Sequence, residues 1–328
     1  MPSSERRKPN YSRRLTWLGV VIVVLFGGYS AAWFYAASKL EAVAGAAIAG
    51  LNQGGTSADC ANPTARGFPF RIGLYCDGLS YANTDEKVGA SVAAFRSAAQ
   101  VYDPMHIVAE LDSPARISGP GGSAITFDWG NLRASVRLTS DFPEQLSAEV
   151  VKLSAAAEAA GPGALATIGQ AEAHMRRSGD DLDLAASFNG ADIDPRLLGG
   201  ADLPPFEGAA DLTIKDGVDL ARFGGSLRGH SGTIRTLSIS SGGTAGLSVT
   251  GPFSVDADGL LNAELKVSIR DPKGLSALLG KAFPANAAQI EASLSGLAAL
   301  GDNPSLPLRI SHGRAMLGFI PLGEIPPL

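Results

Sequence analysis

The side chains that could perform chemistry in this 328-residue chain are few and scattered. No His-Glu-x-x-His pair is present to bind a catalytic zinc ion, and neither a Gly-x-Ser-x-Gly nucleophile turn nor a Gly-x4-Gly-Lys phosphate loop occurs. The histidines stand singly, and we interpret them as residues of wet strand faces, loops and turns: His106, His174, His230 and His312. The sequence therefore predicts a protein that is not an enzyme and binds neither a metal nor a cofactor.

Two acidic groups carry the hard oxygen ligands that calcium prefers. One consists of Asp180, Asp181 and Asp183, and the other of Asp256 and Asp258 before a glycine. Neither completes a twelve-residue calcium loop with its terminal glutamate. We interpret both as turns or solvated strand ends, with calcium binding as the alternative.

The chain has two cysteines, Cys60 and Cys76, with 15 residues between them. Both follow a predicted membrane helix, and an oxidising compartment beyond the membrane would favour a disulfide over a metal site or a nucleophile. A bridge closing a loop of this length stabilises the fold by about 3 kcal/mol in the chain-entropy account.

The positioning element of the whole chain is the run Leu15 to Ala37, 23 residues without Asp, Glu, Lys, Arg or His. As a helix it is about 34 Å long, which is enough to cross a hydrocarbon core of about 30 Å. The preceding residues carry five bases against Glu5, and this excess predicts a cytoplasmic N-terminus and an exported remainder. The bases are Arg6, Arg7, Lys8, Arg13 and Arg14.

A cleaved signal peptide and a buried core helix are the alternatives to a retained anchor. The apolar run is longer than a signal peptide requires, and it lacks the polar face of a soluble helix. We therefore divide the chain into a cytoplasmic basic tail (1–14), a transmembrane helix (15–37), a juxtamembrane helix and linker (38–58) and a periplasmic β-rich domain (59–328).

The composition of the exported part excludes one class of partner and indicates a fold class. The net charge of the chain is −5, and the +4 of residues 1–14 leaves −9 for the remainder, which does not favour nucleic-acid binding. With 40 glycines, 20 prolines and only 18% charged residues, the sequence is typical of short strands joined by turns.

Alternating apolar and polar residues predict about ten strands. The first spans Gly67 to Gly78, and Ile125 to Leu138 is expected to form a hairpin turning at Gly130-Asn131. Residues 150–160 and 164–175 fit weak strands or short helices, and 192–208 fit a linker or long loop. We expect a mainly β fold, in which the membrane helix is followed by a large curved antiparallel sheet. An open half-barrel is one form that such a sheet could take.

The C-terminal part predicts covering helices between its strands. Two strands turn at Asp256 to Gly259, and Asp271-Pro272 is typical of an N-cap followed by proline at the first helical position. A second short helix should follow Pro284. A closing hairpin should turn at His312-Gly313.

Two segments carry a family resemblance: RGFPFRI at Arg66–Ile72, between the cysteines, and GFIPLG at Gly318–Gly323, before a Pro-Pro pair. In them the chain resembles a family of alphaproteobacterial envelope proteins, domain of unknown function 2125. The family has no established activity to transfer. Residues 247–282 also resemble the C-terminal modules of AsmA-like inner-membrane proteins, a resemblance that implies lipid contact.

Our leading hypothesis is a single-pass inner-membrane protein whose periplasmic domain offers an apolar trough to a lipid or other amphiphile. A sheet with one apolar face must cover it, and few helices are available to do so. The residues expected along the trough are Phe68, Phe70, Ile72, Phe127, Trp129, Leu247, Val249, Leu265 and Val267. A closed core is the alternative for each. A scaffold that docks another envelope protein through a sheet edge is the alternative function.

Overall fold

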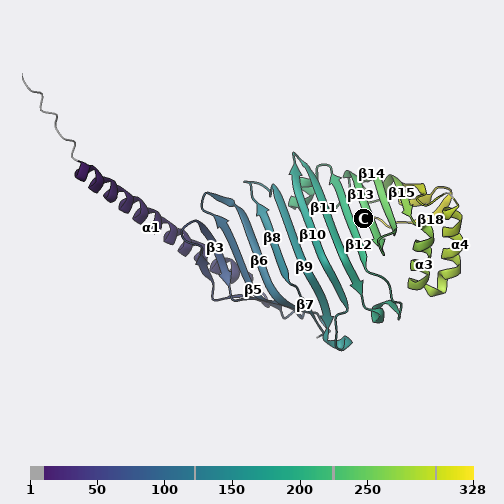
Figure 1. Ribbon diagram of the computed structural model, residues 1–328, viewed down its shortest axis with the longest axis horizontal. Coiled ribbons are helices and arrows are strands. Elements are labelled where there is room, and N and C mark those ends of the chain that lie inside the picture. The colour runs from purple at the N-terminus through teal and green to yellow at the C-terminus, as the bar shows by residue number, and fades with distance from the viewer. Residues whose placement is uncertain (1–10, 122, 224–225, 300) are drawn as a thin grey trace, which may run out of the picture.

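The computed structural model describes residues 11–328 except 122, 224–225 and 300, so most of the basic tail lies outside the described residues. It begins with one uninterrupted helix, α1 (Tyr11–Leu51), which projects beyond the sheet (Figure 1). Among the described residues it is the one helix long and apolar enough to cross a membrane, by length and composition. It includes both the predicted membrane segment and its predicted outward continuation.

The C-terminal half of α1 docks against the β domain through one face. Ser30, Trp33, Ala37, Ala44 and Ile48 are buried or half-buried, at the spacing of one helical face, whereas residues 11–29 remain exposed although Phe26 and Tyr29 contact Phe68. This face lies against the first three strands, β1 (Thr56–Ala61), β2 (Thr64–Arg66) and β3 (Arg71–Cys76). The C-terminal half of the helix therefore makes the contact between α1 and the β domain.

All described strands join a single antiparallel sheet, which confirms the predicted fold class. Its eighteen strands exceed the predicted ten, because several alanine- and serine-rich strands lack a strong apolar signal. After the first three, the strands are β4 (Gly78–Asn83), β5 (Val88–Gln100), β6 (Asp103–Ser118), β7 (Ala124–Asp128), β8 (Asn131–Arg137), β9 (Gln145–Ala157), β10 (Ala166–Ser178), β11 (Asp181–Ile193), β12 (Phe206–Ile214), β13 (Ser231–Ser241), β14 (Ala245–Val255), β15 (Leu261–Arg270), β16 (Ser305–Ser311), β17 (Arg314–Leu317) and β18 (Ile320–Glu324).

The sheet is a meander in which sequential strands pair from β8 to β18. The prediction that Ile125 to Leu138 forms a hairpin is wrong. These residues form β7 and β8, which both pair with β6 on one side and with β9 on the other, so they are two segments of one interrupted strand. The interruption lies at Trp129-Gly130. β3 and β4 likewise share β5 as their neighbour.

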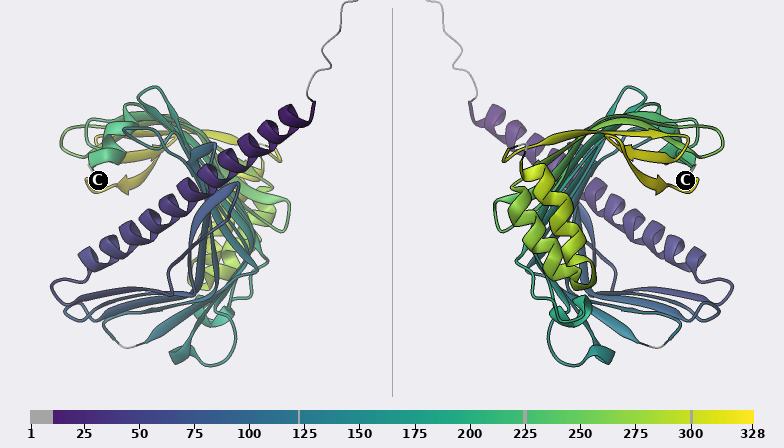
Figure 2. Two further views of the ribbon diagram at one scale, coloured as in Figure 1. Left: turned by 90° about the vertical axis from the view of Figure 1, so that its left-hand side faces the viewer. Right: turned by 90° about the vertical axis from the view of Figure 1, so that its right-hand side faces the viewer.

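The sheet is strongly curved and twisted when it is viewed along its length (Figure 2), while its first and last strands lie at opposite ends of its long axis (Figure 1). In the view of Figure 2 α1 crosses the open side of the curve, while Figure 1 places it at the first-strand end. At the opposite end lie α3 (Pro272–Ala282) and α4 (Ala287–Ala298). The other helical segments are α2 (Gly217–Phe223), η1 (Glu158–Ala160), η2 (Pro195–Leu198) and η3 (Pro284–Asn286).

The predicted N-cap of α3 is present. The amide of Gly274 donates to Asp271 Oδ1 over 3.0 Å, and Pro272 occupies the first helical turn. The helix then buries Leu275 against Ala245 and Ile269 of β14 and β15. Local capping and an apolar stripe together explain why α3 packs onto the sheet.

The predicted disulfide joins Cys60 of β1 to Cys76 of β3, with a Cα–Cα distance of 5.3 Å. Both cysteines are almost completely buried. The bridge ties two strands that do not pair with each other, since β1 pairs with β4 and β3 pairs with β2 and β5. It therefore fixes the sheet edge on which α1 docks.

Candidate functional site

The register of the sheet separates an apolar face from a polar face. Residues directly opposite each other in antiparallel strands project to the same side, so a row of cross-strand pairs traces one face. One row of apolar residues crosses nine strands in direct pairs: Ile72, Ala99, Ile107, Val136, Leu146, Met175, Leu184, Leu212 and Ile234. A second begins at Cys76 and runs through Phe95, Leu111, Leu132, Val150, Ala171, Phe188, Gly208, Ile239 and Leu247 to Ile269.

Between these two rows lies a row of alanines. Its members pair directly across six neighbouring strands: Ala109, Ala134, Ala148, Ala173, Ala186 and Ala210. At about 4.8 Å per strand the alanine row is about 24 Å long. Because alanine side chains end at Cβ while most side chains of the two neighbouring apolar rows extend further, the alanine row is the floor of a shallow groove. The two apolar rows that begin at Ile72 and Cys76 are the flanks of this groove.

Nothing in the described part of the chain covers the middle of this face. Ala134, Ala173 and Ala186 are exposed, and Leu237 and Ile239, farther along the sheet, are each 47% exposed. The described residues include no large side chain less than 2% exposed. The apolar face is therefore open, whereas a closed core would bury its large side chains.

At its far end the apolar face is covered by α3, which leaves a cavity of about 260 Å³ against β13 and β14. The two lining residues with side-chain hydroxyls are Ser240 and Ser241, and both hydroxyls donate elsewhere, Ser240 to Glu207 and Ser241 to Pro204. Lining side chains include Leu203, Ile239, Leu247, Leu275, Leu279 and Phe283. The cavity thus continues the apolar face and offers no free side-chain polar group.

Six of the nine predicted trough residues lie on the apolar face. Ile72 is the first residue of the first apolar row. Phe127 pairs directly with Ala155, which pairs with Ala166, which in turn pairs with Ile193. Because Ile193 lines the α3 cavity, this series of cross-strand pairs places Phe127 on the apolar face. The other four are half-buried on two paired strands, β14 and β15: Leu247, Val249, Leu265 and Val267.

Three predicted trough residues lie elsewhere. Phe68 and Phe70 are outside the strands, because the expected strand from Gly67 is interrupted by a turn with a cis Phe68-Pro69 bond. Phe68 packs against α1, and Phe70 is 71% exposed. Trp129 lines a polar cavity with Arg96 and Asp112, and its indole donates to the Leu111 carbonyl over 2.8 Å. All three residues lie where a predicted strand is interrupted, between β2 and β3 or between β7 and β8, and this explains why they are not on the apolar face.

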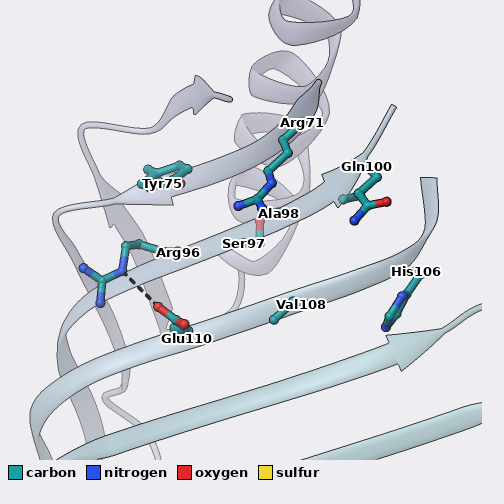
Figure 3. A pocket seen from close by; sticks show the side chains of 10 residues that line it. Arg71, Tyr75, Arg96, Ser97, Ala98, Gln100, His106, Val108 and Glu110 are labelled. Carbon is teal, nitrogen blue, oxygen red and sulfur yellow. Dashed lines mark ion pairs between the residues drawn. The ribbon is translucent and has the colours of Figure 1, made fainter. Parts of the chain in front are cut away.

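The opposite face carries paired charges. Arg96 lies 3.6 Å from Glu110 beside His106 and Val108, with α1 behind the strands (Figure 3). Arg133 donates to Glu149 over 2.7 Å, so charges of opposite sign alternate from strand to strand. Among the described residues no cluster of three potential metal ligands occurs. This face has the character of a solvated outer surface.

The densest charge cluster of the polar face lies on four neighbouring strands, β10, β11, β12 and β13. Thr213 donates to Asp183 over 2.7 Å, Arg176 and Arg235 lie 3.1 and 3.2 Å from the same carboxylate, and Arg235 also pairs with Asp211. The Thr213 hydroxyl and the two guanidinium groups lower the pKa of Asp183, and Arg235 lowers that of Asp211. The cluster therefore links these four strands through ion pairs while both carboxylates are ionised.

Replacing Arg235 with methionine should lower the free energy of unfolding by about 1 kcal/mol at neutral pH, because Asp211 loses its guanidinium partner and Asp183 loses one of its two. A carboxyl group with a depressed folded-state pKa contributes stability above its unfolded pKa, about 3.9, and loses it as the pH falls. In urea unfolding, the difference between wild type and Arg235→Met should therefore be full at neutral pH and smaller at an acidic pH below about 3.9, because it is lost as the pH falls through the lowered pKa values of Asp183 and Asp211. Arg314→Met, which removes an exposed pair, is the control with no effect at either pH.

Comparison with known proteins gives a family but no described activity. A family model described as an uncharacterised protein conserved in bacteria, DUF2125, matches residues 33–326. No curated protein and no solved structure matches the chain. The matched region begins inside α1 and covers the whole sheet.

Proposed function

The chain belongs to the DUF2125 family of uncharacterised bacterial proteins, and on that premise we propose that it holds the hydrocarbon chains of a lipid or similar amphiphile on its apolar sheet face. In this proposal α1 anchors the protein in the inner membrane and the β domain lies in the periplasm. The basic N-terminal tail supports this orientation through the positive-inside rule. The role is binding and handling, without catalysis.

The observation that carries the proposal is the open alanine row. A continuous apolar surface is costly to leave in water, at roughly 25 cal/mol per Å², and exposed patches of this kind mark interaction sites. A hydrocarbon chain along the floor would contact both flanks, while a headgroup stays in water. Each methylene kept from water contributes about 0.8 kcal/mol, so ten of them give about 8 kcal/mol.

The same balance favours exchange with a bilayer. A hydrocarbon chain that moves from the bilayer interior to a dry apolar face exchanges one apolar environment for another, so the hydrophobic free energy changes little. Binding can therefore be reversible without a chemical step.

A photo-cross-linking residue tests this proposal in cells that express the full chain. Placed at Ala173, an exposed position of the alanine row, it should capture lipid on irradiation. Placed at His174, the next residue and also exposed, it should capture none, because side chains alternate between faces along β10. Equal lipid capture at both positions, or none at either, would contradict the proposal.

The edge strand β18 supports a second candidate function, a scaffold that docks another envelope protein. Phe319 is 98% exposed before this strand, and Ile320 and Leu322 within it are 61% and 57% exposed. An exposed apolar edge can pair with a strand of another protein. A protein adduct from a cross-linker at Leu322, combined with no lipid at Ala173, would favour this candidate.

A further inference from the structure

The loop between β2 and β3 is packed against the part of α1 that is apolar enough to lie in a membrane. The ring of Phe68 stacks 5.6 Å from Phe34 and lies 5.5 Å from Trp33 and 6.3 Å from Phe26, measured between ring centroids. Tyr29 donates its hydroxyl to the Pro69 carbonyl, and the Trp33 indole donates to the Arg71 carbonyl over 2.8 Å. The loop therefore has a fixed position along the helix.

That position is inside the hydrocarbon depth. If the core begins at Leu15, the first residue after Arg13 and Arg14, a 30 Å core ends about 20 residues later, near Phe34. Phe26 then lies about 16 Å along the helix, roughly 13 Å short of the outer boundary. Because Phe68 contacts rings from Phe26 to Phe34, its own ring lies within the outer half of the bilayer.

A second loop lies beside the first. The amide of Val101, between β5 and β6, donates to the Phe70 carbonyl over 3.0 Å. The side chains of these two loops, and of the beginning of β6 that follows the second, are exposed and apolar: Phe70 (71%), Val101 (38%), Tyr102 (79%) and Met105 (53%). Such a cluster is out of place in water but suits the membrane interface, where aromatic rings gather.

Charged residues flank the aromatic tip rather than occupy it. Arg66 and Arg71 enclose the sequence Gly67–Phe70, and both are exposed. Their guanidinium groups suit bidentate contacts to lipid phosphates at the level where the loop would leave the hydrocarbon. The nearest acid of the second loop, Asp103, pairs with Arg137 over 3.3 Å.

From this arrangement we propose that the 66–71 loop and the Val101-Tyr102 turn insert into the outer leaflet of the membrane that α1 crosses. This deepens the proposed function and rests on its membrane anchor. Ile72, the first residue of the first apolar row, follows the loop directly. Insertion of the loop therefore places the beginning of the apolar face at the bilayer surface. Lipid chains can then reach the alanine row without crossing water.

The test uses the full chain in vesicles of phosphatidylethanolamine and phosphatidylglycerol, with an environment-sensitive fluorophore on a single new cysteine. The native cysteines form a disulfide and do not react. The label at Phe70→Cys should show a blue-shifted emission and lose most of its fluorescence to lipids carrying a quencher on the acyl chain. A label at Phe319→Cys, on the far edge, should lose none.

A third label, at Val24→Cys on the exposed half of α1, separates the possible failures. Quenching at 24 without quenching at 70 would overturn the loop insertion while leaving the anchor intact. No quenching at 24 would overturn both. Equal quenching at 70 and 319 would show that the β domain associates with lipid non-specifically, which also contradicts the proposal.

Discussion

Aspartates at both Ala134 and Ala186 should reduce the lipid that co-purifies with the β domain by at least about 100-fold. A hydrocarbon chain on the alanine row would have to desolvate each carboxylate, which costs several kcal/mol, and every 1.4 kcal/mol is a factor of ten in affinity. The two positions are exposed and lie three strands apart, so the fold has room for both side chains and their charges do not adjoin. Lipid in an organic extract, counted per protein by mass spectrometry, is the measurement.

The sheet supplies a matched control for this variant. Ser135 and Ser187 directly follow the two alanines and project to the polar face, so Ser135→Asp with Ser187→Asp adds the same charge to the same strands. The control should retain wild-type lipid. Equal loss in both variants would mean that net charge, and not the apolar face, governs lipid content.

Replacing both cysteines with serine should lower the free energy of unfolding by about 3 kcal/mol. The Cys60–Cys76 bridge closes a loop with a sequence separation of 16. In the chain-entropy account, loss of the bridge raises the conformational entropy of the unfolded chain and so lowers the free energy of the unfolded state by about 3 kcal/mol. Both sulfur atoms are also buried, so the serines bring polar groups into an apolar site. Urea unfolding followed by tryptophan fluorescence measures the change.

A reducing agent provides the internal check on the disulfide prediction. It should destabilise the wild type towards the value of the double variant and leave the double variant unchanged. If reduction leaves the wild-type stability unaltered, the bridge does not form in the purified protein. The outcome would then favour two free thiols at this edge.

Local signals made much of the fold predictable. The uncharged run from Leu15, the Asp271-Pro272 cap and the His312-Gly313 turn each act within a few residues, and the structure contains the corresponding helix, cap and hairpin. The disulfide followed from the cysteine count and the expected compartment. Such features depend on interactions between residues that are close in the sequence, so they can be predicted from the sequence alone.

Strand pairing was less predictable, because partners are chosen by distant segments. Ile125 to Leu138 has the alternation and the Gly130-Asn131 turn of a hairpin, but β6 and β9 flank both halves and pair with them in line. The same holds for Phe68 and Phe70, which alternate as a strand would and instead follow the packing of Phe68 on α1. Tertiary contacts overrode the local pattern at both sites.

The alanine row left a signal in the sequence that single-strand patterns do not reveal. The unit apolar-x-Ala-x-apolar recurs in successive strands, as in Ile107 to Leu111, Leu132 to Val136, Leu146 to Val150 and Leu184 to Phe188. Aligning these units against one another would have placed the alanines side by side. Treated one strand at a time, alanine only weakened the strand signal in the middle of the chain.

The most direct test of lipid binding on the apolar face is the lipid content of residues 38–328, the juxtamembrane segment with the β domain, secreted with a cleavable leader and purified without detergent. We expect a stoichiometric lipid or amphiphile in the organic extract, which the Ala134→Asp, Ala186→Asp variant lacks and the Ser135→Asp, Ser187→Asp variant keeps. A clean extract from folded, monodisperse protein would contradict lipid binding on the apolar face. The exposed β18 edge and a protein partner would then become the leading explanation.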